Sequence, residues 1–299
     1  MNTSPLHEVT EADVAYYEEN GFVCLRQMFD SEWVERMRGA IEDVYGQGPQ
    51  FMKMNPDGTP GKFWVNLYVW NFNDDFRAFA FESPAAQIAS KLMKSSRINM
   101  ISDVIFHKAP KSPHPTPWHQ DQPYWFVDGW QVCGLWVALD AVTLESGAVE
   151  YIKGSHKWGK WYEPESFDVT GKYGPFRGED TEEMKAAMDD KTSDGFEPMP
   201  NISAERDKYE IVSFDTEPGD CIVNHFLTVH SARGNPTQRN RRAIAFRFAG
   251  DDATFAVRKA EYRLKPHADP KLKPGDPFPP DHPLYPQVWP PRRDAHQAA

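Results

Sequence analysis

Hydrophobic residues in the first hundred positions recur at helical spacing and are separated by short polar segments. Thr10 and Asp13 have the spacing of a capping box, and positions 33, 34, 37, 41 and 44 give a second segment one apolar face. The pattern predicts three helices: one between Thr10 and Gly21, one after Asp30 or Ser31, and one from Pro84 to about Lys94. A short strand is expected at residues 22–26.

From residue 98 onward the pattern changes to short apolar runs punctuated by glycine, proline and aspartate. The strand candidates are residues 99–107, 132–139, 148–152, 210–214, 220–224 and 243–248. Many short strands without intervening helices favour a sandwich or jelly roll over a parallel sheet. We therefore expect a mainly β protein with flanking helices.

The chain is expected to form one domain over residues 1–299, with a mixed helical flank at 1–97 and a β-core at 98–250. A polar stretch at 159–208 interrupts the core, and a loop of this length in a compact domain is often a lid over a site. The segment 251–299 is rich in proline and is expected to wrap the surface in extended form.

Charge and composition narrow the class of protein. Lys and Arg number 33 against 44 Asp and Glu, giving a formal charge of −11, which argues against binding to nucleic acid or an anionic membrane. The odd count of 3 cysteines fits a reducing, cytoplasmic location. No run of about 18 apolar residues predicts a membrane span, and the N-terminus does not have the pattern of a secretion signal.

The densest chemical signal is PTPWHQDQPYW at 115–125. In a strand, His119 and Asp121 would point to one face, where both can bind one metal, although this spacing alone is common by chance. His230 ends a later strand pattern and supplies a third ligand. Two histidines and one carboxylate leave metal positions open, which is typical of Fe(II) enzymes that activate oxygen, whereas structural zinc prefers four ligands.

Two arginines follow at 241 and 242. A buried arginine about ten residues beyond the second histidine would pair with a carboxylate, as a metal-chelating 2-oxo acid requires. Arg241 shares its strand face with Ala243 and Ala245, which leave room for a ligand, so we favour Arg241 as the inward residue, while Arg242 stays an alternative.

Several motifs in order resemble the phytanoyl-CoA dioxygenase family of Fe(II)/2-oxoglutarate-dependent oxygenases over roughly residues 10–250. They are ENGFVCLR near the start, HQD at 119–121, WVALDAV at 136–142, SGAVEYIKGSHKWG at 146–159, GDCIVNHFLTVH at 219–230 and RRAIAFRF at 241–248. The resemblance implies a double-stranded β-helix of the jelly-roll or cupin-like type. It also implies iron ligands at His119, Asp121 and His230, a 2-oxoglutarate arginine at Arg241, and a tryptophan beside the cosubstrate at Trp136. One departure is Ala232, where many members carry Ser or Thr; here Ser231 is shifted by one position.

The expected function is therefore a non-haem dioxygenase that uses Fe(II), 2-oxoglutarate and O2 to hydroxylate a small molecule, releasing succinate and CO2. Related halogenases have Gly or Ala in place of Asp121, so this carboxylate argues against halogenation. Desaturation, epoxidation or ring closure on the same site stays open, as does a non-catalytic jelly-roll protein that binds a metal or ligand. The substrate and the oligomeric state are not determined by the sequence.

Residues around the expected metal site provide further candidates. Tyr124, Trp125, Phe126 and Trp130 follow it directly and are our first choice for the substrate wall, with core packing as their default role. His156 is expected at the edge of the site, and His225 is expected to be structural. We expect the polar stretch at 159–208 to become protected from trypsin when iron, 2-oxoglutarate and substrate bind.

Overall fold

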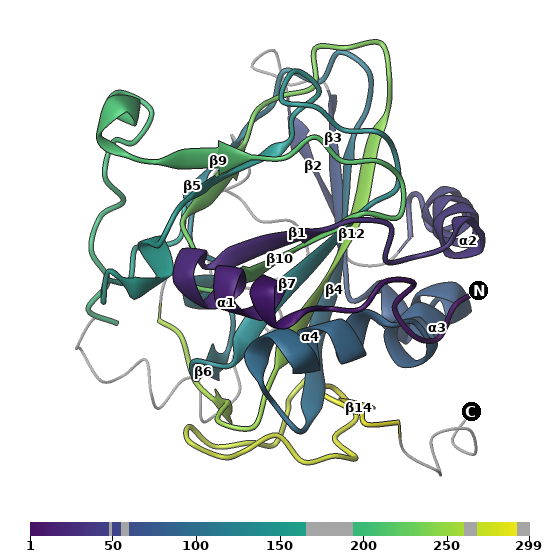
Figure 1. The fold of residues 1–299 in the computed structure, drawn as a ribbon, viewed down its shortest axis with the longest axis vertical. Coiled ribbons are helices and arrows are strands. Elements are labelled where there is room, and N and C mark those ends of the chain that lie inside the picture. Colours follow the sequence, from purple (N-terminus) through teal and green to yellow (C-terminus); the bar gives the residue numbers. More distant parts are fainter. Residues whose placement is uncertain (48–49, 55–59, 166–193, 260–267, 292–299) are drawn as a thin grey trace.

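Two antiparallel β-sheets face each other and form a double-stranded β-helix, which confirms the expected jelly-roll fold (Figure 1). The computed structural model describes residues 1–47, 50–54, 60–165, 194–259 and 268–291. The larger sheet has eight strands: β1 (Phe22–Leu25), β10 (Cys221–His225), β7 (Val132–Ala138), β12 (Arg241–Ala249), β4 (Ile98–Lys108), β3 (Pro60–Leu67) and β2 (Gln50–Met54) in that order, with β14 (Gln287–Trp289) also paired to β4. The smaller sheet has the order β5 (Thr116–His119), β11 (His230–Ala232), β8 (Val149–Ile152) and β9 (Ile211–Ser213). A short ribbon pairs β6 (Val127–Asp128) with β13 (Thr254–Phe255).

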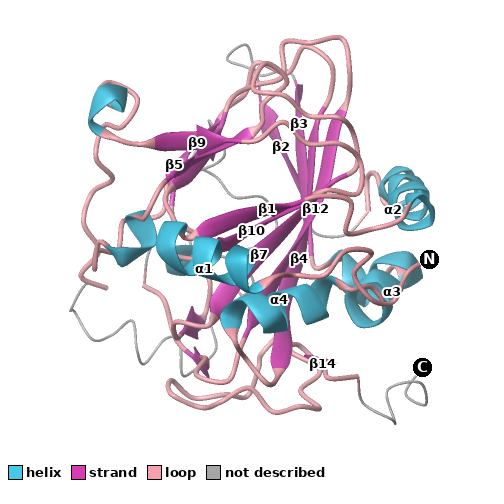
Figure 2. Cartoon of the chain, viewed as in Figure 1, coloured by secondary structure: helices cyan, strands magenta, loops and turns pink. Residues whose placement is uncertain are grey.

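Helices cover the outer face of the larger sheet (Figure 2). They are α1 (Glu11–Asn20), α2 (Ser31–Asp43), α3 (Asp74–Glu82) and α4 (Ala85–Met93). Short 3-10 turns lie before α3 and between later strands: η1 (Val69–Asn71), η2 (Gln122–Tyr124), η3 (Ser155–Lys157) and η4 (Arg206–Lys208). The predicted capping box is present, because the Thr10 hydroxyl accepts the Asp13 N–H and the Asp13 carboxylate accepts the Thr10 N–H. The three predicted helices correspond to α1, α2 and α4, whereas α3 was not predicted.

Strand β12 shows how the two faces of the larger sheet divide. Ile244, Phe246 and Phe248 belong to the core shared with the helices, where Phe246 stacks on Phe79 of α3 with ring centroids 5.0 Å apart. The alternate positions Ala243 and Ala245 belong to the cluster between the sheets. Side chains on this inner face therefore project into the interior of the β-helix, where a ligand site can form.

The flanking segments contribute more strands than the sequence pattern suggests. Residues before 98 supply β1, β2 and β3 to the larger sheet, so this flank is part of the β-helix. In the described part of the proline-rich segment, turns alternate with short strands, and residues 287–289 pair with β4. Among the described residues, no helix combines the length and apolar content needed to cross a bilayer.

Most of the expected lid, residues 166–193 of the stretch 159–208, lies outside the described residues. Its two described ends pair with each other, because Glu163 N–H donates to Glu197 O and Glu197 N–H donates to Trp161 O, both at 2.8 Å. The Tyr162 N–H also donates to the Gln120 side chain at 3.0 Å. Gln120 stands between His119 and Asp121, so both ends of the stretch are held beside the expected metal ligands.

Candidate metal centre

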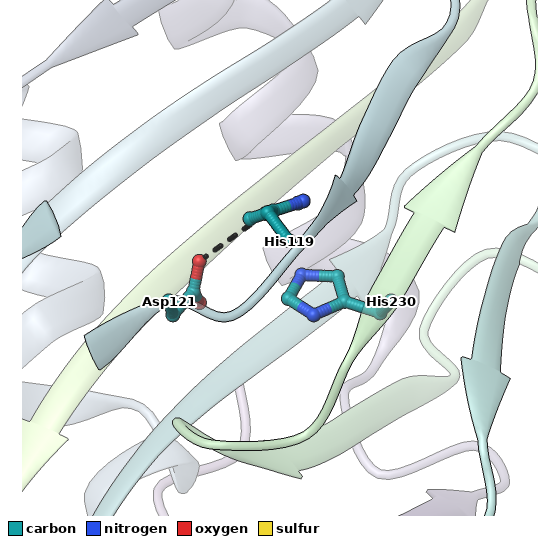
Figure 3. A group of neighbouring side chains, drawn as sticks. All are labelled: His119, Asp121 and His230. Carbon is teal, nitrogen blue, oxygen red and sulfur yellow. Dashed lines mark ion pairs between the residues drawn. The ribbon is translucent and has the colours of Figure 1, made fainter. Parts of the chain in front are cut away.

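The three expected ligands come together where β5 and β11 pair. His119 ends β5 and His230 begins β11, and the two residues are direct cross-strand partners. Asp121 follows β5, and its N–H donates to Phe226 O at 2.9 Å. One potential ligand atom from each of the three residues lies within 4.8 Å of the others (Figure 3).

The route by which Asp121 reaches the site differs from the expected one. The sequence pattern put His119 and Asp121 on one face of a strand, but the strand ends at His119 and Asp121 adopts a helical conformation (φ −73°, ψ −43°) at the start of η2. Pro123 stands in the first turn of η2, a position that suits its fixed φ. The turn still brings the carboxylate to 3.5 Å from His119 Nε2.

Backbone carbonyl groups orient both imidazoles. His119 Nδ1–H donates to Pro117 O, and His230 Nδ1–H donates to Thr228 O, each at 2.9 Å. A proton on Nδ1 leaves the lone pair of Nε2 for a metal, and such a second hydrogen bond is the usual way in which proteins fix a ligating histidine. Both rings are therefore set in the tautomer that binds a metal through Nε2.

Burial and charge also favour the ligand forms. Burial alone would raise the pKa of Asp121, but the Arg247 charge and the neighbouring His119 imidazole hold the pKa of this carboxyl well below its usual value. Burial, together with the neighbouring His119, lowers the pKa of His230 to about 3. Near neutral pH the carboxylate is charged and His230 is neutral, as metal binding requires. Two imidazole nitrogens and one carboxylate suit Fe(II) with open positions, so the donor set fits the implied iron.

A cavity with about 870 Å³ of atom-free space, including its opening, adjoins these ligands between the two sheets. Arg241 and Trp136 line it, and the Arg241 guanidinium carbon lies 5.0 Å from the centre of the Trp136 ring. Arg241 Nη2 donates to Gly147 O at 3.1 Å, while its buried Nε has no hydrogen-bond partner among the described residues. A buried cation with a free donor is suited to bind a carboxylate.

The neighbouring Arg242 lies on the opposite strand face. Its Nη2 and Nε donate to the two Asp140 carboxylate oxygens at 2.9 and 3.0 Å. Arg242 is half-buried and does not line the cavity. The alternation of β12 therefore separates a cavity arginine from a paired one.

Several cavity residues were missed by the sequence analysis. Asn224 of β10, Gly134 of β7 and Arg247 of β12 lie in register across three neighbouring strands, and all three line the cavity. A side chain at Gly134 would place its Cβ 3.4 Å from the Asp121 carboxylate and 3.3 Å from the Asn224 amide oxygen. A Cβ here would therefore crowd the Asn224 amide and come into van der Waals contact with the Asp121 carboxylate. The signal for Arg247 was its parity with Arg241 along β12.

The other candidates divide between the cavity and the scaffold. Tyr124 and Trp125 line the cavity, whereas Phe126 packs in a core cluster behind it. Trp130 is 51% exposed and lies over His225, with ring centroids 4.3 Å apart. His156 also contacts this pair and does not line the metal cavity, so the expectation that it borders the site is wrong. The His225 ring instead fixes the backbone, because its Nδ1 accepts the Leu227 N–H.

Comparisons with known proteins agree with the motif resemblance. The family model described as phytanoyl-CoA dioxygenase (PhyH) matches residues 17–243. A probable phytanoyl-CoA dioxygenase of Caenorhabditis elegans is 23% identical over 254 residues, covering 79% of this chain and 74% of that protein.

Two solved structures share the fold over almost the whole chain. The non-heme alpha-ketoglutarate-dependent carbocyclase SnoK from nogalamycin biosynthesis superposes with a TM-score of 0.71 at 19% identity, covering 96% of this chain and all of its own (100%). The epimerase SnoN in complex with Fe3+, alpha ketoglutarate and nogalamycin RO superposes with a TM-score of 0.69 at 19% identity, covering 93% of this chain and 98% of its own.

Proposed function

Because this chain belongs to the phytanoyl-CoA dioxygenase family and is an Fe(II)- and 2-oxoglutarate-dependent oxygenase, we propose that His119, Asp121 and His230 bind its iron. The observation that carries this assignment is the approach of their three ligand atoms to within 4.8 Å of one another. The carbonyl groups that hold both Nδ1 atoms support it, because they direct the Nε2 lone pairs to one point.

The same proposal assigns 2-oxoglutarate to the Arg241 end of the cavity. The free Nε of Arg241 binds the carboxylate remote from the metal, and the Trp136 ring beneath it shields the pair from water. Ala232 offers no hydroxyl, but Thr116 is its cross-strand partner and lines the same cavity. Thr116 therefore supplies the hydroxyl that the family pattern places at residue 232.

We propose that the reaction is hydroxylation of a small molecule, coupled to conversion of 2-oxoglutarate and O2 into succinate and CO2. Iron would supply the oxygen activation, while the chain binds and orients the reactants and keeps water out of the site. The apolar walls of the cavity support this role. Solved proteins with this fold include a carbocyclase and an epimerase, so ring closure or epimerisation is the alternative outcome on the same site. A non-catalytic binding protein is disfavoured, because ligand binding alone does not call for both a metal triad and a free buried arginine.

We also propose a cytoplasmic location. Cys24, Cys133 and Cys221 are free thiols, and Cys133 and Cys221 are buried, which suits a reducing compartment.

Metal analysis tests the assignment. Reconstitution without oxygen should give about one Fe(II) per chain and, with 2-oxoglutarate, the visible charge-transfer absorption of a chelated 2-oxo acid. His119→Ala, Asp121→Ala and His230→Ala should each lose the iron and the absorption, because two ligands hold a metal weakly. His107→Ala, whose ring pairs with Asn240 outside the cavity, is the matched control and should keep both. Full iron content in any of the three variants would remove that residue from the metal site.

A further inference from the structure

We propose that Arg247 is the anchor for a carboxylate of the substrate, and that the substrate is therefore a small organic acid with an apolar body. This inference rests on the proposed function, since it concerns the second reactant of the same site. Arg247 lies on the inner face of β12, two strand repeats beyond Ala243, and it lines the cavity that holds the iron ligands.

The Arg247 side chain is buried but incompletely bonded. Arg247 is 6% exposed, and its Nε and Nη1 have no hydrogen-bond partner among the described residues. The nearest carboxylate is Asp121, at 3.6 Å between Nη2 and Oδ2, which is longer than an N–H···O hydrogen bond. Buried donors are almost always satisfied, so free N–H groups at a cavity wall point to a ligand that satisfies them.

Arg247 and Arg241 serve different molecules. Their guanidinium groups have different neighbours, because that of Arg241 lies 5.0 Å from the Trp136 ring centre and that of Arg247 lies 5.4 Å from the Trp125 ring centre. With Arg241 holding its remote carboxylate beside Trp136, Arg247 is left for another anion on the Asp121 side of the metal.

The charge of the cavity also calls for one more anion. Among the side chains lining it, Arg241 and Arg247 are the cations and Asp121 is the anion. Fe(II) and the 2-oxoglutarate dianion carry equal and opposite charges, so one positive charge remains. Asp103 also acts on Arg247, but burial raises the Asp103 pKa to about 7, so near neutral pH it offsets only part of this charge. A substrate carboxylate completes the neutralisation.

The side chains around Arg247 indicate which kind of group the rest of this substrate carries. The guanidinium lies 5.4 Å from the Trp125 ring centre and 5.7 Å from that of Phe106. Strands β3 and β4 extend the same wall with apolar side chains of Phe63, Val65, Leu67 and Val104. An acid whose carboxylate meets Arg247 would lay an apolar body along this wall, near the iron ligands.

Paired probes test the inference. Hexanoate and 3-phenylpropanoate, each with its primary amide, are titrated calorimetrically without oxygen into enzyme loaded with Fe(II) and saturating 2-oxoglutarate. We expect each acid to bind at least about tenfold more tightly than its amide, because only the acid forms charge-assisted hydrogen bonds. In Arg247→Gln this preference should vanish while the 2-oxoglutarate charge-transfer absorption stays.

The controls separate the alternatives. Arg242→Gln changes an arginine on the other face of the same strand and should keep the full preference. Arg247→Lys keeps the charge but not the planar fork, so a reduced preference is expected there even if Arg247→Gln does not fold. Equal binding of acids and amides to the wild type, or an unchanged preference in Arg247→Gln or Arg247→Lys, would overturn the anchor. Loss of the absorption in Arg247→Gln would also overturn it and assign Arg247 to positioning Asp121. Absence of the absorption in the wild type would instead count against the proposed function.

Discussion

At the scale of single residues, Arg241 and Arg242 are neighbours with opposite surroundings. Arg241→Leu should raise the 2-oxoglutarate concentration for half-saturation at least about tenfold, because a buried charge-assisted pair is lost. Arg242→Leu should leave this value unchanged and lower the free energy of unfolding by about 1 kcal/mol, through loss of the Asp140 pair. Titration of the charge-transfer absorption and urea unfolding measure the two quantities. The reverse result would exchange the roles of these arginines.

Single residues also show which parts of the site could be predicted from the sequence. His119, Asp121 and His230 could be selected because their residue types and spacing suit a metal. Gly134 could not, because its contribution is the absence of a side chain beside Asn224 and Asp121, and that proximity depends on pairing between β7 and its neighbours. Residues that act by being small become visible only in three dimensions.

At the scale of elements, helix α2 contains a glycine, Gly39, at a position where the structure leaves room for a side chain. Gly39 is exposed in mid-helix, and a Cβ there meets no atom within 4 Å. Gly39→Ala should raise the free energy of unfolding by about 0.5–1 kcal/mol, because alanine loses less backbone entropy. Thermal unfolding measures the change.

Gly21, at the C-cap of α1, is the contrasting position for the same substitution. It has φ +85°, and a Cβ would lie 2.4 Å from the His156 ring. Gly21→Ala should therefore destabilise the protein. Equal melting shifts for the two variants would contradict the assigned roles of these glycines.

The strands differ in how well the sequence pattern predicted them. The candidates after residue 98 stood between turn residues, and those at 99–107, 132–139 and 220–224 match β4, β7 and β10 within one residue at each end. Strand β3 was missed because Phe63, Trp64 and Val65 are all buried, so no alternation of polar and apolar residues marks it. Tertiary burial on both faces removed the signal on which strand prediction relies.

At the scale of the whole molecule, a buried histidine away from the metal makes stability depend on pH. Burial and the neighbouring His156 lower the pKa of His225 to about 3, against an ordinary value of 6.5. Between these values the unfolded chain binds the proton and the folded chain does not, so stability falls as the pH drops below about 6.5. From pH 7 to pH 5 this histidine should cost the metal-free protein about 2 kcal/mol.

His225→Asn separates this contribution from those of other groups. The asparagine side chain does not titrate and can still accept the Leu227 N–H that His225 Nδ1 accepts. The variant should have a lower overall stability but a shallower loss between pH 7 and pH 5, measured as the urea midpoint of the metal-free protein. A loss as steep as that of the wild type would show that His225 is not the group responsible.

The pairing of His119 with His230 has a consequence for the life of the protein in a cell. These residues lie opposite each other on β5 and β11 but are far apart along the chain, so a metal bound by both ties a long loop closed. A covalent link around a loop of roughly 100 residues stabilises by about 4–5 kcal/mol. A metal that binds only the folded chain stabilises it by mass action, in proportion to the logarithm of the metal concentration. If His119 and His230 bind the iron as proposed, iron supply would govern how long each molecule survives proteolysis as well as whether it can turn over.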